Sequence, residues 1–283
     1  MRMSAAHRAL LAPGLLILAG LVVAPIALMT IESLRPFVGG AGAAGGWTLN
    51  NYTELIAPAY AFYFWDTFRI GFLVSAVTVV LSAPLAWQAA RTQIHLVRVS
   101  IFGLLISLLF MSLIAKLYAI QMTWGPTGPL AVLGTLIGVP VRSPDYAEVQ
   151  VCIGLLHFVL PLATLMLMGA FQNISPRLEE AASSLGAPRW RVLLNVTLPL
   201  SVPGLLSTFL LVFAMCISNF VVPLILGRGM VLFTTNLMYT RFSDVANYPS
   251  GAAIGVIMLV LAGGLVYAMA FVARRMASRE TWR

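Results

Sequence analysis

Residues 172–202 read QNISPRLEEAASSLGAPRWRVLLNVTLPLSV, a polar and turn-rich interval between two long apolar stretches. Ser175 followed by Pro176 predicts a helix start, because the hydroxyl can cap free N–H groups and proline is preset for the first helical position. Gly186 can adopt the left-handed conformation that ends such a helix, and Pro188 prevents its simple continuation. The interval therefore predicts two short helices bent at a glycine.

The first of these helices has an acidic start, with Glu179 and Glu180 where the helix dipole favours negative charge. Its small and apolar side chains share one face: Leu178, Ala181, Ala182 and Leu185. A second short run covers 188–197, and Pro199 and Pro203 are expected to break the chain after it. The pair could rest on lipid headgroups, but an acidic, small-sided helix fits a protein socket with basic residues better.

The chain on either side of this interval is strongly apolar, with 60% apolar and 9% charged residues. Soluble proteins carry about 25% charged residues, so the composition excludes a disordered chain, a coiled coil and most soluble enzymes. A membrane-spanning helix needs roughly 20 mostly apolar residues. Six stretches meet this requirement: 11–33, 68–90, 99–120, 149–171, 203–226 and 251–273. The first is interpreted as a retained helix, because its apolar core is longer than that of a signal peptide.

The distribution of basic residues predicts the orientation in the membrane. If the N-terminus is cytoplasmic, the inner segments hold Arg2, Arg8, Arg91, Arg98, Arg177, Arg189, Arg191, Arg274, Arg275, Arg279 and Arg283. The outer segments then hold Arg35, Arg69, Lys116, Arg142, Arg228 and Arg241. The inner excess favours two cytoplasmic termini, and it explains the net charge of +8 without nucleic-acid binding.

The sequence thus predicts an all-α integral membrane protein with six transmembrane helices and both termini cytoplasmic. Its expected parts are an N-terminal tail with the first helix (1–34), an external loop (35–67), a five-helix core domain (68–275) that contains the loop 173–200, and a cytoplasmic tail (276–283).

The loop resembles the EAA motif of the permease subunits of type I ABC importers. It has Glu180-Ala181-Ala182, three residues, Gly186, nine residues and then Val196-Thr197-Leu198-Pro199, where the family pattern has isoleucine in place of Val196. The motif also lies where the family has it, in a cytoplasmic loop before the penultimate span. This resemblance implies the type I importer fold and a multi-pass protein of the bacterial inner membrane.

The resemblance implies that the loop forms a coupling helix, which docks on a cytoplasmic ATPase dimer and turns the permease when the dimer closes. Glu180 would pair with a basic ATPase residue, Gly186 would supply the bend, and Leu198 and Pro199 would join the loop to the fifth span. The residues implied in coupling are Glu179, Glu180, Ala181, Ala182, Leu185, Gly186, Leu198 and Pro199.

The same resemblance implies the other partners: a second permease subunit, taken as a homologous but different chain, and an external solute-binding protein. No cofactor is expected on this chain, because ATP and Mg would be bound by the ATPase. The chain has no G-x-x-x-x-G-K-[ST] motif, and its one lysine is Lys116. A transporter that lacks its own nucleotide site needs such a partner.

Two other classes of function compete with this interpretation. An ion-coupled transporter or a channel that acts without an ATPase is the alternative, although no carboxylate lies in the middle of a predicted span. An intramembrane enzyme is disfavoured, because the histidines at 7, 95 and 157 are scattered and no H-E-x-x-H or G-x-S-x-G occurs. No catalytic or metal site is expected, and Cys152 and Cys216 lie in apolar runs as small hydrophobic residues.

Three segments resemble the polyamine-type branch of the importers: GPTGPLAVLGTLIGVP (125–140), ISNFVVPLILG (217–227) and NLMYTRFSDVANYPSGAA (236–253). The branch implies a polyamine-like or related small organic solute. Many of its members carry an acidic residue at the position of Asn219, and an amide there weakens the case for a cation. Asn219, with its neighbours Ser218 and Phe220, is the candidate for the translocation path. The alternative for Asn219 is an interhelical hydrogen bond, worth about 1 kcal/mol.

Overall fold

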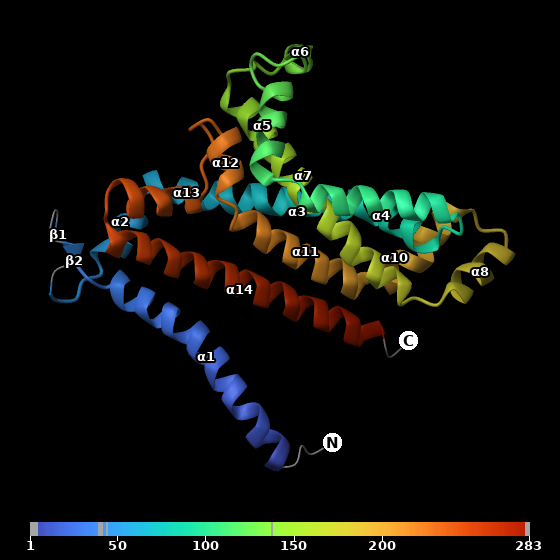
Figure 1. Ribbon diagram of the computed structural model, residues 1–283, viewed down its shortest axis with the longest axis horizontal. Helices are drawn as coiled ribbons and strands as arrows, with labels where there is room; N and C mark the ends of the chain where they lie inside the picture. Colours follow the sequence, from blue (N-terminus) through green and yellow to red (C-terminus); the bar gives the residue numbers. More distant parts are fainter. Residues whose placement is uncertain (1–4, 39–41, 44, 137, 281–283) are drawn as a thin grey trace. The chain divides into compact units, whose positions relative to one another are not determined.

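The structure, a computed structural model, describes residues 5–38, 42–43, 45–136 and 138–280, and nearly all of its regular elements are helices (Figure 1). The ends of the two predicted tails and part of the glycine-rich segment near residue 40 lie outside these ranges. The elements in chain order are α1 (Ala5–Ser33), β1 (Phe37–Val38), β2 (Gly42–Ala43), α2 (Asn50–Leu55), α3 (Pro58–Arg91), α4 (His95–Phe110), α5 (Leu113–Trp124), α6 (Ala131–Leu136), α7 (Pro144–Gln172), α8 (Pro176–Ser184), α9 (Arg189–Val192), the π-helical turn η1 (Leu193–Thr197), α10 (Leu198–Leu200), α11 (Val202–Ile217), α12 (Val221–Leu226), α13 (Thr234–Tyr239), the π-helical turn η2 (Thr240–Asp244) and α14 (Tyr248–Glu280).

The described helices include three that are long and apolar enough to cross a membrane: α3, α7 and the Tyr248–Met269 part of α14. Two further pairs of helices qualify only as bent spans, α4 with α5 and Arg189–Leu200 with α11. The described part of α1 adds a shorter apolar helix, Ile17–Ser33. The chain is therefore a multi-pass membrane protein, while the count of six spans and the side of the termini stay predictions.

The predicted span at 99–120 is not one straight helix. Met111 has an extended backbone, and the two helices on either side of it meet at 98°. A bend leaves carbonyl groups at the end of α4 without helical partners. The Lys116 ammonium donates to the Leu108 carbonyl over 2.8 Å and so satisfies one of them within the chain.

The predicted span at 203–226 is also interrupted, because α11 ends at Ile217 and α12 begins at Val221. Pro223 explains the break in part, since it has no N–H and its ring clashes with the carbonyl four residues earlier. That carbonyl belongs to Asn219, and it accepts instead from the Thr235 hydroxyl over 3.0 Å.

One smaller expectation also needs correction. The helical run that begins at Arg189 continues through Pro199 to Leu200, and the chain turns by 76° at Ser201. A π-helical turn precedes Pro199, so the missing N–H falls where the hydrogen-bond register has already shifted. The segment after α1 contains a minimal antiparallel hairpin, in which Phe37–Val38 pairs with Gly42–Ala43.

The chain folds as two units, of which one comprises 1–62 with Leu237–Gly263 and the other Tyr63–Asn236 with Gly264–Arg283. In the first unit, the Asn51 amide donates to the carbonyls of Ser33 and Arg35 and fixes α2 on the end of α1. Arg241 pairs with Glu54 over 2.7 Å in the same unit. These contacts fix α2 and the segment around it through polar side chains.

The second unit contains the main core, in which α7 packs against α5, α11 and α12. A second cluster lies at the other end of α3 and α7, where Ala86 and Ala89 pack on Leu167 and Phe171. Small residues allow these helices to approach closely, as is usual in membrane bundles. Gly154 is an example, since a β-carbon there would overlap Leu226 and lie 2.9 Å from Val222.

Gly154→Ala is therefore expected to destabilise the protein by about 1–3 kcal/mol through overpacking of a buried contact. Gly169→Ala is the matched control, because a β-carbon at that position of α7 would find no neighbouring atom within 4 Å. Thermal unfolding in detergent should show a lower midpoint for the first variant and an unchanged or higher one for the second. Equal midpoints would mean that α7 and α12 are not in close contact.

Candidate functional site

Helix α8 begins where the sequence predicts, with Ser175 at the N-cap and Pro176 at the first position. The expected hydroxyl cap is absent, because the Ser175 side chain makes no capping hydrogen bond. The Ser175 carbonyl accepts from the Leu178 N–H over 3.2 Å instead. Proline at the first position therefore sets the start of the helix without help from the serine hydroxyl.

The end of α8 is a glycine bend. Gly186 has φ +87°, and a β-carbon there would meet no atom within 4 Å, so the glycine is needed for its backbone conformation. The Gly186 N–H donates to the Ser183 carbonyl over 2.9 Å, and the Ala187 N–H donates to the Ala182 carbonyl over 3.2 Å. These two bonds make a Schellman motif. The predicted bend is thus confirmed, with α9 starting three residues after it.

Glu179 lies inside the loop. Its side chain is 11% exposed, and both carboxylate oxygens accept from Arg91 Nε over 3.0 Å. The Thr197 hydroxyl, on η1, donates to Glu179 Oε1 over 2.9 Å. Arg91 Nη2 donates in addition to the carbonyls of Phe171 and Ile174. Glu179 therefore holds the loop together, whereas the sequence grouped it with the docking residues.

A neighbouring face of α8 is open. Leu185 is 89% exposed and Leu178 49% exposed, and Glu180 and Ala181 are exposed beside them. Among the described residues, Glu180 makes no ion pair. The helix thus turns one carboxylate inward and presents a free carboxylate with apolar side chains outward. This arrangement is typical of a surface that binds a protein.

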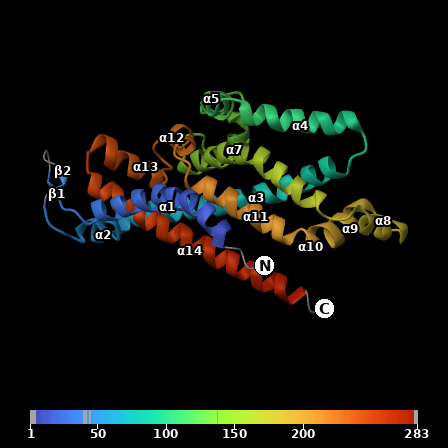
Figure 2. The same cartoon turned by 60° about the horizontal axis from the view of Figure 1, so that its bottom comes forward.

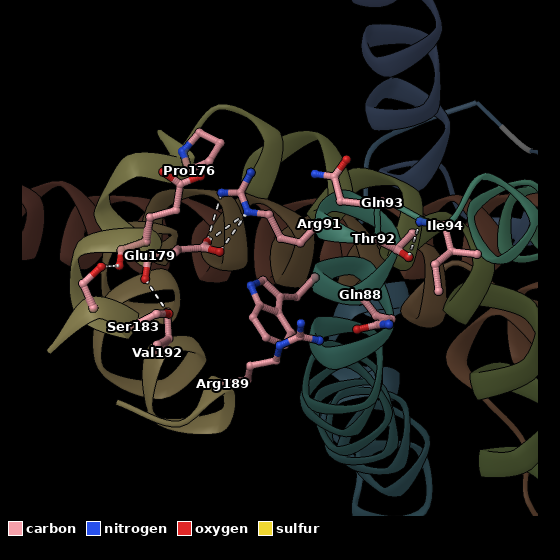
Figure 3. Close-up of a pocket in the computed structure, with 13 residues that line it drawn as sticks. Gln88, Arg91, Thr92, Gln93, Ile94, Pro176, Glu179, Ser183, Arg189 and Val192 are labelled. Carbon is pink, nitrogen blue, oxygen red and sulfur yellow. Dashed lines mark hydrogen bonds and ion pairs between the residues drawn. The ribbon is translucent and has the colours of Figure 1, made fainter. Parts of the chain in front are cut away.

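A pocket of about 650 Å³ lies between α8 and the end of α3. Figure 3 shows Arg91 reaching across to Glu179, with Gln88, Thr92 and Gln93 on the other side of the opening. Glu180 and Arg189 also line it, so together with Glu179 and Arg91 two acidic and two basic side chains face the same space. Figure 2 shows α9 and α10 next to α8, all within the second unit.

The remaining coupling candidates lie along the same loop. Ala182 is half-buried. Leu198 is also half-buried and packs against the second core cluster, which α3 and α7 form. Pro199 is exposed on α10. Sequence reasoning missed Arg91 and Thr197. Thr197 lies within the quoted motif and could have been singled out, but Arg91 is 88 residues from its partner and no local pattern indicates it.

The three path candidates lie at the break between α11 and α12. Asn219 is buried, and its Oδ1 accepts from the Val222 N–H over 2.9 Å, which caps α12. The Asn236 amide donates to the Phe220 carbonyl over 3.0 Å. Ser218 is exposed and makes only a long bond to its own helix. The side-chain oxygen Oδ1 of Asn219 therefore makes a local hydrogen bond that supports the structure, and not a bond between two spans.

The described residues offer no set of three or more His, Cys, Asp or Glu side chains that could hold a metal ion. Cys152 and Cys216 are free thiols. The loop therefore has two notable features, the internal ion pair of Arg91 with Glu179 and an exposed surface with one carboxylate and apolar side chains.

Several curated proteins are similar to this chain in sequence. The spermidine/putrescine transport system permease protein PotB of Haemophilus influenzae is 29% identical over 78% of this chain and 77% of its own length. The protein of the same name in Escherichia coli is 27% identical over 76% of this chain and 79% of its own length. The inner membrane ABC transporter permease protein YdcU of Escherichia coli is 24% identical over 80% of this chain and 75% of its own.

Solved structures share the fold. A chain of a bacterial ABC transporter that imports the acidic polysaccharide alginate matches with a TM-score of 0.75 and 16% identity, over 94% of both chains. A chain of the MetNI methionine ABC transporter matches with a TM-score of 0.55 and 17% identity, over 79% of this chain and 99% of that one. The model of the family described as binding-protein-dependent transport system inner membrane component matches residues 71–278. The chain therefore belongs to the family of inner membrane components of binding-protein-dependent transport systems.

Proposed function

We propose that this chain is the permease subunit of an ATP-driven importer in a bacterial inner membrane, where it forms half of the path for a small polar solute. The family and the fold support a transport subunit and not an enzyme. ATP and Mg would be bound by a separate ATPase. An external binding protein would deliver the solute, by analogy with the alginate transporter, which has been solved in complex with a periplasmic protein.

The outward surface of α8 carries this proposal furthest. Glu180 is exposed and unpaired in the described structure, while Glu179 next to it is held by Arg91. The exposed Leu185 and the bend at Gly186 lie at the same end of the helix. We infer that α8 is the coupling helix and that Glu180 pairs with a basic residue of the ATPase. Ala181 and Ala182 then permit close approach, and Leu198 and Pro199 connect the loop to α11.

The complex would contain two permease chains, an ATPase dimer and the binding protein. We propose that the second permease is a homologous but different chain. Many large apolar side chains are exposed on the described helices of each unit, among them Leu21 in the first and Val80 in the second. Their exposure supports contact with lipid and with a second subunit. Six spans with both termini in the cytoplasm would place α8 on the ATPase side.

The solute is proposed to be a polyamine or a related small organic molecule, in keeping with what the names of the PotB relatives say of those proteins. The break at Ser218, Asn219 and Phe220 supports a path at this point. Irregular backbone at membrane depth is tolerated where protein buries it or where it lines an aqueous cavity. Asn219 would shape the break through its cap on α12, and Ser218 and Phe220 would lie nearer the solute.

An ion-coupled transporter or a channel is the competing function. It would need no ATPase, so a free docking surface on α8 would have no purpose. The two functions differ in what accompanies the chain out of the membrane.

Glu180→Arg is expected to abolish recovery of the ATPase with the tagged chain, because reversal of the charge replaces an attraction with a repulsion at a docking contact. The measurement is affinity purification from native membranes in mild detergent, followed by mass spectrometry. Asp145→Arg makes the same change of charge at the exposed start of α7 and should leave the ATPase in place. A wild-type chain that is folded, active in liposomes and free of any P-loop ATPase would rule out the importer.

Asn219→Ala is expected to lower the stability of the protein by about 1 kcal/mol, because it removes the acceptor that caps α12. Ser218→Ala serves as the neighbouring control, since the Ser218 hydroxyl has only one bond, of 3.4 Å. The readout is thermal unfolding in detergent, and an unaffected Asn219→Ala variant would mean that the cap is dispensable.

If the solute is a polyamine, the binding protein that purifies with the complex should be stabilised by spermidine or putrescine against thermal unfolding. An uncharged polyol at the same concentration is the control. A response to neither polyamine would remove polyamines as the solute and leave the permease assignment intact.

A further inference from the structure

The guanidinium of Arg91 joins three parts of the chain by hydrogen bonds: the end of α3, the end of α7 and α8. Arg91 is the last residue of α3. Its Nη2 donates to the carbonyl of Phe171, in the last turn of α7, over 3.0 Å and to that of Ile174 over 2.8 Å. Its Nε donates to both carboxylate oxygens of Glu179, on α8. Arg91 therefore holds the ends of two long helices and α8 at one point.

Glu179 extends this connection to a fourth segment. The Thr197 hydroxyl donates to Glu179 Oε1, and Thr197 is fully buried on η1, just before α10 and α11. We name the three side chains Arg91, Glu179 and Thr197 the loop clamp. All of its bonds to Glu179 and from Arg91 involve a charged group, which makes them stronger than bonds between neutral groups.

Among the described residues, Arg91 and Glu179 make the side-chain hydrogen bonds between α3 and α8. The two residues are 88 positions apart in the chain, and α8 packs mainly on α9 and η1. The chain enters α8 through a short turn after α7 and leaves it at Gly186, which is a bend with open space around it. Without the clamp, α8 could therefore tilt about its two ends and leave α3 where it is.

We propose that Arg91 is a positioning residue for energy coupling: through Glu179 it makes the ends of α3 and α7 follow α8 when α8 is pushed. This inference rests on the proposed role of α8 as the coupling helix. It adds a specific residue, outside the motif, through which movement of the loop reaches the spans. Arg91 does not touch the ATPase in this scheme, so binding of the ATPase and transmission of its movement are separable.

The test uses the complex as purified from membranes, with Ser218→Cys as a reporter in the exposed break between α11 and α12. The rate at which a maleimide modifies position 218 is measured with and without Mg-ATP and vanadate. The same complex without the reporter substitution gives the background from Cys152 and Cys216. Recovery of the ATPase, its rate of ATP hydrolysis and the unfolding temperature are measured on the same samples.

Arg91→Met with Glu179→Met is the main variant. Replacing both charges with apolar side chains of similar length leaves no buried charge unpaired, so the fold is expected to survive. Arg91→Lys is the second variant, because one ammonium keeps the charge but cannot reproduce the planar fork of donors. Arg98→Gln, at an exposed site in the first turn of α4, is the control for loss of a cytoplasmic arginine.

In the double variant we expect ATPase recovery and ATP hydrolysis as in the wild type, while the nucleotide-dependent change in labelling rate falls about tenfold. Arg91→Lys should fall in between, and Arg98→Gln should match the wild type. The proposal is overturned if the double variant responds like the wild type, or if it loses the ATPase, since Arg91 would then only shape the docking surface. If the double variant does not fold, Arg91→Lys decides between these outcomes. A wild-type chain without any ATPase would instead overturn the proposed function itself.

Discussion

Every break in a helix at membrane depth leaves backbone groups that water cannot satisfy, and this constraint organises the structure. The chain meets it with side chains at each interruption. Lys116 serves the carbonyl of Leu108 at the bend after α4, and Asn219 serves the N–H of Val222 at the break after α11. Arg91 serves two carbonyls at the end of α7. These three polar side chains thus satisfy backbone groups where the helices of an apolar chain stop.

The sequence predicted the helical fold well, because the lengths of apolar stretches are set by the thickness of a bilayer. It did not predict the bends, since hydropathy averages over a window and does not register one extended residue such as Met111. The break after Ile217 had a visible signal in Pro223, but prolines are common in membrane helices and are tolerated there. The hairpin at Phe37–Val38 was missed because two residues per strand carry no periodicity.

The candidate site likewise has features that the sequence predicts and one that it does not. The bend at Gly186 and the exposed position of Glu180 follow from residues that are near in sequence, so spacing alone could predict them. The inward position of Glu179 depends on Arg91, which arrives from a different helix. Two adjacent glutamates look alike in a sequence, and only the packing of α3 beside α8 gives them opposite roles.

The backbone conformation at the end of α8, and not the space around it, restricts which residue can stand at position 186. Space is not limiting there, because a β-carbon would meet nothing within 4 Å, and only the positive φ excludes other residues. The position is therefore selective for handedness and not for size. A side chain attached with the mirror-image configuration would suit the same backbone, whereas the smallest ordinary one would bring a cost of roughly 1–2 kcal/mol. The direction in which the loop leaves α8 thus depends on the one kind of residue that has no chiral centre.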